Sequence, residues 1–378
     1  MRMKRPNLFS MLFGFLLGLS FHFFTTYYLE TTNHSNNLNY LHNAKKELSS
    51  QEKLGVKMEK PTQSLQKKIE QSFHTNAAQR ATIRSAISRL EERELKNAIE
   101  IFDVLCSNEK TCHLQPPFVY LPSQYKIAKK YGLTACSIFK NMSTILMAIM
   151  CYLHEPQRIL NSKWSFYEQW DTRRACLGYN ELDTWPQVAW KLGRKMEDIT
   201  KFALIREPME KFMSAYTNQC LTVNKCGGCQ NLTCIFEMLE QNSEDYRLRG
   251  LFGVSGQPRS HVNAHFLPQN WRCEFGTMID DYVLINYNSS DSAVLIRDLE
   301  QLFDDVGVNR ESIRFISNKL SSGRTCHSTI GKKELVSERE KLEGDPRLMR
   351  RYLNFFFFDY LTLGYPLPEV KKIKVNEE

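Results

Sequence analysis

Charged residues are missing from one long stretch near the start of the chain, and this absence points to a membrane segment. No Asp, Glu, Lys or Arg occurs in residues 8–29. As a helix, such a stretch reaches about 33 Å, enough to cross a bilayer core of about 30 Å. The preceding residues 1–7 carry Arg2, Lys4 and Arg5, so they are expected to stay cytosolic. The pattern predicts a single-pass type II membrane protein, with a cleaved signal peptide as the alternative.

Residues 30–95 have few aromatic side chains and no cysteine, and they are rich in Lys, Gln, Glu, Ser and Asn. This composition does not favour a packed core, so the segment is interpreted as a luminal stem. Within it, apolar residues at helical spacing predict an amphipathic helix over residues 81–101. We expect this helix to dock on the folded domain, placed at 96–370, and self-association of the stem into a homodimer is the alternative. Residues 371–378 are interpreted as a charged tail.

Cysteine is confined to the region between Cys106 and Cys326, where all 11 are found. The lumen is oxidising, so disulfides are expected, and the odd count leaves at least one thiol unpaired within the chain. Cys106 and Cys112 are expected to close a small loop. Cys136 and Cys151 fall in a predicted strand and helix and are expected to be free or packed in the core. A further group predicts a disulfide-tied loop, with a zinc site as the alternative: Cys220, Cys226, Cys229 and Cys234.

Glycine is missing from the loop that carries the first functional signal. Residues 135–153 read as a strand, a tight loop and a helix that is apolar on all sides. A helix N-terminus favours anions, and here Lys140 adds a full positive charge while Ser143 or Thr144 adds a hydroxyl donor. Because the loop lacks the G-x-x-x-x-G-K-[ST] pattern, it does not resemble the common nucleoside triphosphate loop. A solvated lysine beside a helix cap is the alternative.

A second strand, turn and helix are predicted over residues 199–216. The helix has an apolar stripe formed by Met209, Phe212, Met213 and Tyr216. Ser214 lies off this stripe, so it can converge with Arg206 on one anion. The alternative is that Arg206 pairs with Glu207 or Glu210 and Ser214 faces water.

Together, these two elements resemble the 5′-phosphosulfate and 3′-phosphate loops of Golgi carbohydrate sulfotransferases. The likeness is strongest to the group that contains the chondroitin and HNK-1 sulfotransferases. Lys-x-x-Ser-Thr stands at 140–144, and Arg-Glu-Pro-x-x-[Arg/Lys]-x-x-Ser-Ala-Tyr at 206–216. Further blocks follow in the family's order and extend the resemblance over roughly residues 100–368: 263–269 with Cys273, 281–287, and 352–365.

The resemblance implies an α/β, P-loop-like sulfotransferase fold, in which helices flank a central parallel sheet and the donor lies at the strands' carboxyl ends. The implied donor is 3′-phosphoadenosine 5′-phosphosulfate, and no metal is required. Lys140 would act on the leaving oxygen, and Arg206 with Ser214 would hold the 3′-phosphate. The implied 5′-phosphate loop comprises Lys140, Asn141, Met142, Ser143 and Thr144.

The same resemblance implies transfer to a glycosaminoglycan in the Golgi, most closely to the 4-O position of chondroitin. His265 is the first candidate for the general base, and His154 is the second. The formal charge of +8 suits an acidic acceptor, and a luminal location excludes nucleic acid as a partner. Among the N-x-[ST] glycosylation sequons, the one at Asn141 is expected to be bare, because a glycan there would block the site.

Two positions depart from the family pattern, because Phe139 stands where many members have Pro and Met142 where they have Gly. Met142 is expected to crowd the backbone at the phosphosulfate. A catalytically inactive, membrane-anchored glycan-binding protein is therefore the alternative function. A luminal kinase is disfavoured because neither loop offers an Asp to hold Mg²⁺ near the phosphates.

Overall fold

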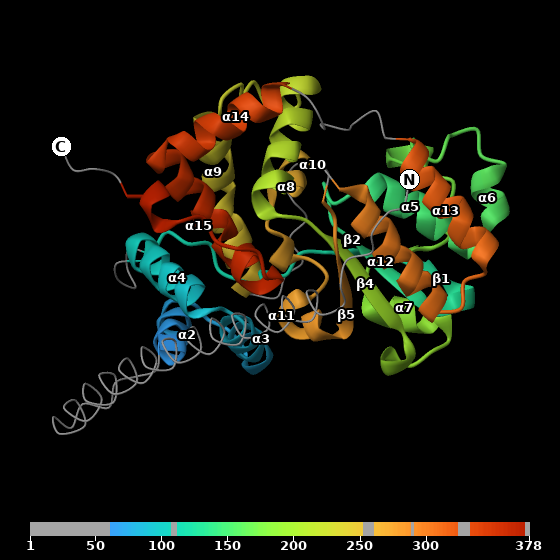
Figure 1. Cartoon of the computed structure of the whole chain (residues 1–378), viewed down its shortest axis with the longest axis horizontal. Helices are drawn as coiled ribbons and strands as arrows, with labels where there is room; N and C mark the ends of the chain where they lie inside the picture. The colour runs from blue at the N-terminus through green and yellow to red at the C-terminus, as the bar shows by residue number, and fades with distance from the viewer. Residues whose placement is uncertain (1–60, 107–111, 252–260, 289–290, 324–332, 375–378) are drawn as a thin grey trace, which may run out of the picture. The chain divides into compact units, whose positions relative to one another are not determined.

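A five-stranded sheet lies at the centre of the fold, in a computed structural model that describes residues 61–106, 112–251, 261–288, 291–323 and 333–374 (Figure 1). The strand order is β3-β1-β2-β4-β5. The strands are β1 Gln124–Ala128, β2 Leu133–Ser137, β3 Glu181–Leu182, β4 Thr200–Ile205 and β5 Tyr282–Asn286. Because β2, β4 and β5 are parallel, their carboxyl ends meet at one edge, where Ile205 pairs with Asn286.

The prediction of a parallel sheet is right for these three strands and wrong for the other edge. β1 is antiparallel to both β2 and β3. Only the turn containing η2 (Lys129–Tyr131) and Gly132 joins β1 to β2. A parallel pair needs a crossover of a dozen or more residues, so this short turn permits only a hairpin. The result is a mixed α/β sheet.

Helices cover both faces of the sheet, and the alternation along β4 shows how. Phe202 and Leu204 point into one apolar cluster, whereas Ala203 and Ile205 point into another. The first face is covered by α5 (Ser143–His154), α12 (Ser292–Asp305) and α13 (Arg310–Ser322). The opposite face is covered by α7 (Trp185–Leu192) and the short α11 (Phe275–Met278).

A second, all-helical core is built around α15 (Pro346–Leu363), whose Phe355 to Phe358 are all buried. Every residue from Phe355 to Leu363 is buried, so α15 has no water-facing side there and other helices surround it. These are α2 Pro61–Ser72, α3 Ala77–Ser88, α4 Glu92–Leu105, α8 Pro208–Ala215, α9 Leu232–Leu251 and α14 Lys333–Gly344. The short helix α10 (His261–Phe266) adds Phe266 to this core, whereas the short helix α6 (Pro156–Leu160) packs its Ile159 in the cluster on the sheet.

The folded unit begins at Pro61, well before the boundary of 95 that the composition suggested for the stem. Leu65 and Ile69 of α2 are completely buried in the helical core. The amphipathic stretch predicted over 81–101 forms two helices, α3 and α4, which pack in the same core. At the other end, Ile373 is also buried, so the first residues of the predicted tail belong to this unit.

Five disulfides join cysteines of the described residues, and two of them correct the sequence-based expectation. Cys136 and Cys151 were expected to be free or packed in the core; both are buried in the core, but they are bonded to Cys273 and Cys176. Each partner lies on a loop that covers the buried position, and the sequence separations of 137 and 25 residues conceal this. The small loop and the disulfide-tied loop are confirmed by Cys106–Cys112, Cys220–Cys226 and Cys229–Cys234. Cys326 lies outside the described residues.

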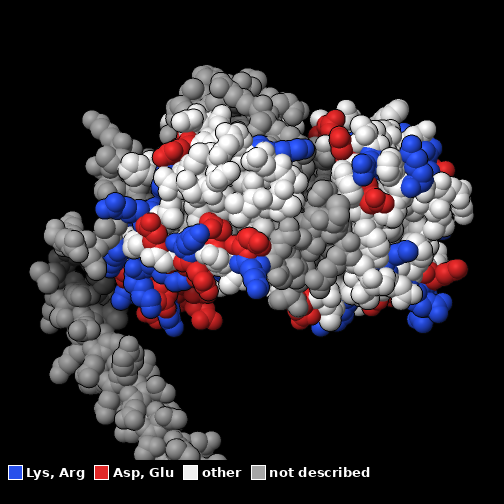
Figure 2. Space-filling view, turned by 90° about the horizontal axis from the view of Figure 1, so that it is seen from above, with Lys and Arg blue, Asp and Glu red and all other residues white. Residues whose placement is uncertain are grey.

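Among the helices that the structure describes, none combines the length and apolar character needed to cross a membrane. The predicted anchor at residues 8–29 lies outside the described residues, as does the start of the stem (grey in Figure 2).

Candidate active site

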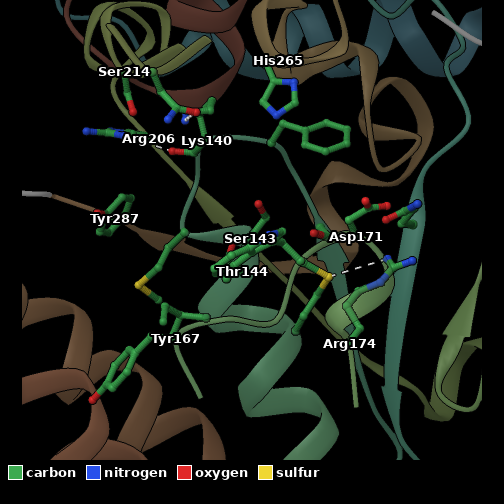
Figure 3. Close-up of a pocket in the computed structure, with 18 of the residues that line it drawn as sticks. Lys140, Ser143, Thr144, Tyr167, Asp171, Arg174, Arg206, Ser214, His265 and Tyr287 are labelled. Carbon is green, nitrogen blue, oxygen red and sulfur yellow. Dashed lines mark hydrogen bonds between the residues drawn. The ribbon is translucent and has the colours of Figure 1, made fainter. Parts of the chain in front are cut away.

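A cavity of about 1250 Å³ opens where β2, β4 and β5 end, and most of the predicted site residues line it (Figure 3). Those that do are Lys140, Met142, Ser143, Thr144, Arg206, Ser214 and His265. They come from four separate elements, so the fold brings together side chains that are distant in sequence. Asn141 and His154 are not among the lining residues.

The loop from β2 to α5 is strongly bent, because Lys140 and Met142 both have left-handed backbone angles, with φ of 69° and 58°. Met142 is the residue before the first turn of α5, so the helix N-terminus with Ser143 and Thr144 faces the cavity. Lys140 reaches across the cavity, where its Nζ donates to Asn218 Oδ1 at 3.1 Å. A left-handed conformation costs an L-residue about 1–2 kcal/mol. This cost is a physical reason why the family pattern has glycine where this chain has Met142.

Asn141, which stands between Lys140 and Met142 in this loop, is completely buried. Its Nδ2 donates to Leu204 O at 2.8 Å and to Gln269 Oε1 at 2.6 Å. The Asn141 side chain therefore holds the loop on β4 and does not line the cavity. Its burial also leaves no room for a glycan at this sequon.

Arg206 and Ser214 lie on the same side of the cavity, and each is only 5% exposed (Figure 3). Arg206 Nη1 donates to Lys140 O at 3.0 Å, which links the two predicted loops directly. Its Nε donates to Glu210 Oε2 at 3.3 Å, so Arg206 does form the ion pair with Glu210 that was the alternative to anion binding. Arg206 nevertheless lines the cavity. Its guanidinium also lies over the ring of Tyr287, at 5.0 Å from the centroid.

The buried side chain of Gln269 connects the two loops further. Gln269 Oε1 accepts from Arg206 N at 3.1 Å, and Nε2 donates to Arg206 O at 2.7 Å. The same Oε1 accepts from Asn141, as described above. Asp359 of α15 holds this residue in turn, because its carboxylate accepts from the backbone N–H groups of Gln269 and Asn270 at 2.8 and 2.7 Å. Gln269 belongs to the block 263–269 that resembles the family, but its bridging role between the two loops is visible only in the structure.

His265 is 8% exposed and points into the cavity from α10 (Figure 3). Its ring lies 4.6 Å from that of Phe139, tilted by 37°, so the departure from proline at position 139 gives the imidazole a packing partner. The backbone carbonyls of His265 and Leu267 accept from Nζ of the buried Lys211 at 3.2 and 2.8 Å. Burial lowers the pKa of Lys211 to about 7.

His154 is separated from the cavity, because it ends α5 whereas the cavity lies at the start of this helix. Twelve residues at 1.5 Å each place the two ends about 17 Å apart. Its Nδ1 accepts from Lys129 N at 3.4 Å, and burial lowers its pKa. The structure therefore favours His265 over His154 as a group that can reach a substrate.

The sequence did not indicate several other lining residues. Asn218 belongs to the π-helical stretch η5 (Tyr216–Thr222) after α8, a local geometry for which the sequence offered no signal. Arg272 lies between the block 263–269 and Cys273, and its Nη1 donates to Pro122 O at 2.6 Å. Another part of the cavity wall is formed by Trp170, Asp171 and Arg174. Among the described residues, no group of three or more His, Cys, Asp and Glu side chains is placed to hold a metal ion.

Comparisons with known proteins agree with this geometry. A carbohydrate sulfotransferase of Caenorhabditis elegans, chst-1, is 30% identical over 271 residues, which cover 66% of this chain and 79% of the relative. An uncharacterised protein of the same organism is 29% identical over 317 residues, covering 82% and 86%. No solved structure matches the chain. A sequence model of the sulfotransferase family matches residues 123–366, which contain all the predicted site residues that line the cavity, and the chain therefore belongs to the sulfotransferase family.

Proposed function

We propose that this protein transfers a sulfuryl group from 3′-phosphoadenosine 5′-phosphosulfate to a hydroxyl of an acidic glycosaminoglycan, with the 4-O position of chondroitin as the first acceptor to test. The observation that carries the proposal is the pair of cationic loops joined by the Arg206–Lys140 hydrogen bond. One loop suits the 5′-phosphosulfate, and the other suits the 3′-phosphate that distinguishes this donor from ATP. The name of the chst-1 relative supports a carbohydrate acceptor.

The residues of the cavity fit the two ends of such a donor. At one end, the N-terminus of α5 and the hydroxyls of Ser143 and Thr144 offer hydrogen-bond donors to a phosphate. At the other end, the Arg206 guanidinium is oriented by Glu210 and Tyr287 and lies beside Ser214. A buried guanidinium that is already fixed loses little conformational freedom when it binds a phosphate.

The transfer requires stabilisation of the leaving group and removal of one proton. As the acceptor oxygen bonds to sulfur, the bond between sulfur and the 5′-phosphate oxygen breaks and negative charge grows on that oxygen. Lys140 stabilises this charge, and its hydrogen bond to Asn218 keeps it in the cavity beforehand. His265 accepts the proton of the attacking hydroxyl through its imidazole.

Location follows from the same reasoning. Disulfides persist in oxidising compartments, and five are present among the described residues, which supports residence of the folded unit in the Golgi lumen. The uncharged stretch at residues 8–29 would provide the anchor.

The test uses the full-length protein with ³⁵S-labelled donor and desulfated chondroitin, dermatan and heparosan. Lys140→Ala should lower kcat by about 10²–10³-fold, because the charge on the leaving oxygen loses its stabilising partner. Lys130→Ala is the matched control, since Lys130 is exposed on η2 at the amino end of β2, the opposite end from Lys140. Label should enter chondroitin with wild type and this control.

The base is tested with the two histidines. His265→Ala should lower kcat by about 10²–10⁴-fold, whereas His154→Ala should leave kcat unchanged. Equal losses in both variants would reject the assignment of His265. If wild type transfers no label to any polymer and adenosine 3′,5′-bisphosphate does not raise its thermal midpoint, the protein is instead the inactive glycan-binding relative.

A further inference from the structure

The chain between α6 and α7 carries a row of aromatic and cationic side chains next to the cavity. We define the 163–173 strip as Lys163, Trp164, Trp170 and Arg173. The Arg173 guanidinium carbon lies 4.7 Å from the ring centre of Trp164 and 5.3 Å from that of Trp170. Lys163 Nζ lies 5.1 Å from the ring centre of Trp164. The four side chains therefore form one continuous surface in which cations and indole rings alternate.

This strip begins in the cavity wall and extends away from it. Trp170 lines the cavity, together with its neighbours Asp171 and Arg174. Figure 3 shows Asp171 and Arg174 on the side of the cavity opposite Tyr287. In the proposed function Arg206, which lies over the Tyr287 ring, holds the 3′-phosphate of the nucleotide, so the opposite wall is the side from which an acceptor would enter.

The segment that carries the strip is held in place before any ligand binds. Gln169 is buried, and its Nε2 donates to Ser165 O at 2.9 Å while its Oε1 accepts from Ala175 N at 2.7 Å. The Cys151–Cys176 disulfide ties the end of the segment to α5. Tyr167 OH donates to Lys319 O of α13 at 2.8 Å. A preformed surface loses little entropy on binding, which favours a role in recognition.

The residue types on the strip match one class of ligand. Indole rings offer flat apolar faces that pack on the C–H faces of sugar rings, and Lys and Arg pair with carboxylates or sulfates. The nearby Glu168 carboxylate accepts from Ser165 N at 3.1 Å and from its Oγ at 2.7 Å, and these bonds, with a smaller contribution from the charge of Arg173, lower its pKa.

We propose that the 163–173 strip binds the saccharides that follow the acceptor sugar of an acidic polysaccharide, so that the protein acts on a long polyanionic chain in preference to a short one. This inference rests on the proposed function, because it assumes that the acceptor sugar occupies the cavity. Arg173 is the central residue, since it lies between the two indoles and is one of the two cations of the strip.

The test compares two acceptor lengths with the full-length protein: desulfated chondroitin polymer and its disaccharide. Arg173→Gln and Trp164→Ala should each raise KM for the polymer about tenfold and leave kcat and the KM for the disaccharide unchanged. Trp190→Ala is the matched control, because Trp190 on α7 is 81% exposed and is not part of the cavity wall. Thermal midpoints with adenosine 3′,5′-bisphosphate establish that each variant is folded and binds the nucleotide.

Equal KM changes for polymer and disaccharide would overturn the proposal, as would an equal effect of Trp190→Ala. If neither the wild type nor any variant transfers label, the proposed function has failed. The strip is then tested separately by measuring the fluorescence anisotropy of labelled chondroitin polymer with each protein. Weaker polymer binding by Arg173→Gln than by Trp190→Ala would then support the strip, and equal binding would reject it.

Discussion

Replacing the buried Lys211 by methionine should change how the stability of this fold depends on pH. The Lys211 side chain is 1% exposed, and this burial lowers its pKa from 10.5 to about 7. Asp359 opposes the shift, whereas Arg272 and Arg206 add to it. The folded state therefore disfavours the protonated amine, and the unfolded chain does not.

The sign and size follow from proton linkage. Between pH 7 and 9, Lys211 is protonated in the unfolded chain but loses its proton in the folded state, so the free energy of unfolding rises with pH. Integration over this range gives a rise of about 2 kcal/mol. Burial also lowers the pKa of Lys126, to about 8, which adds a rise of about 1 kcal/mol. Wild type should therefore gain about 3 kcal/mol from these two lysines.

The assay is equilibrium unfolding in urea of thiol-blocked protein with intact disulfides, at pH 7, 8 and 9 and constant ionic strength. Lys211→Met should retain a rise of only about 1 kcal/mol, the part that belongs to Lys126. Lys126→Met is the control and should retain about 2 kcal/mol. If Lys211→Met keeps the full rise, Lys211 is not the group that titrates, and the reasoning from burial is refuted.

Two further substitutions test the loops of the cavity. Met142→Gly relieves the left-handed strain but makes the unfolded chain more flexible, so stability should change by less than about 1 kcal/mol. Removing the Met142 side chain from the cavity wall should tighten the binding of adenosine 3′,5′-bisphosphate, measured by calorimetry. Weaker binding would show that the methionine side chain contributes contacts. Gln269→Met leaves the backbone N–H and C=O of Arg206 without these partners, so it should lower stability by about 3 kcal/mol in urea unfolding and weaken nucleotide binding. Full stability with unchanged binding would contradict the bridging role of Gln269.

Local patterns in the sequence were sufficient for the elements that carry the cavity. The stretch 199–216 was predicted as strand, turn and helix, and it forms β4 and α8. The apolar run after Thr144 was predicted as a buried helix and belongs to α5. The spacing of apolar side chains within a few residues is enough to predict these elements. It also places Lys140 and Arg206 just after their strands.

The remaining features depend on contacts between residues far apart in the chain. Gln269 contacts Asn141 across 128 residues, and Cys136 meets Cys273 across 137. The role of Phe139 beside His265 also needs two separate elements to be placed in space. No periodicity or local spacing encodes such pairs, so only the folded structure distinguishes a ligand-facing residue from one that supports it.

The helix that fills the second core also fixes the loops that line the cavity. Asp359 of α15 holds the backbone of Gln269, which in turn holds Arg206 on both sides of its backbone. The next residue, Tyr360, donates from its hydroxyl to Glu207 Oε1 at 2.7 Å, and Glu207 caps α8 by accepting from two of its N–H groups. Two adjacent residues of α15 therefore determine the position of the Arg206 turn. This coupling is a physical reason for the Asp359 and Tyr360 pair near the end of the chain to accompany the two loops of the cavity, because without it the Arg206 guanidinium would lose its fixed orientation.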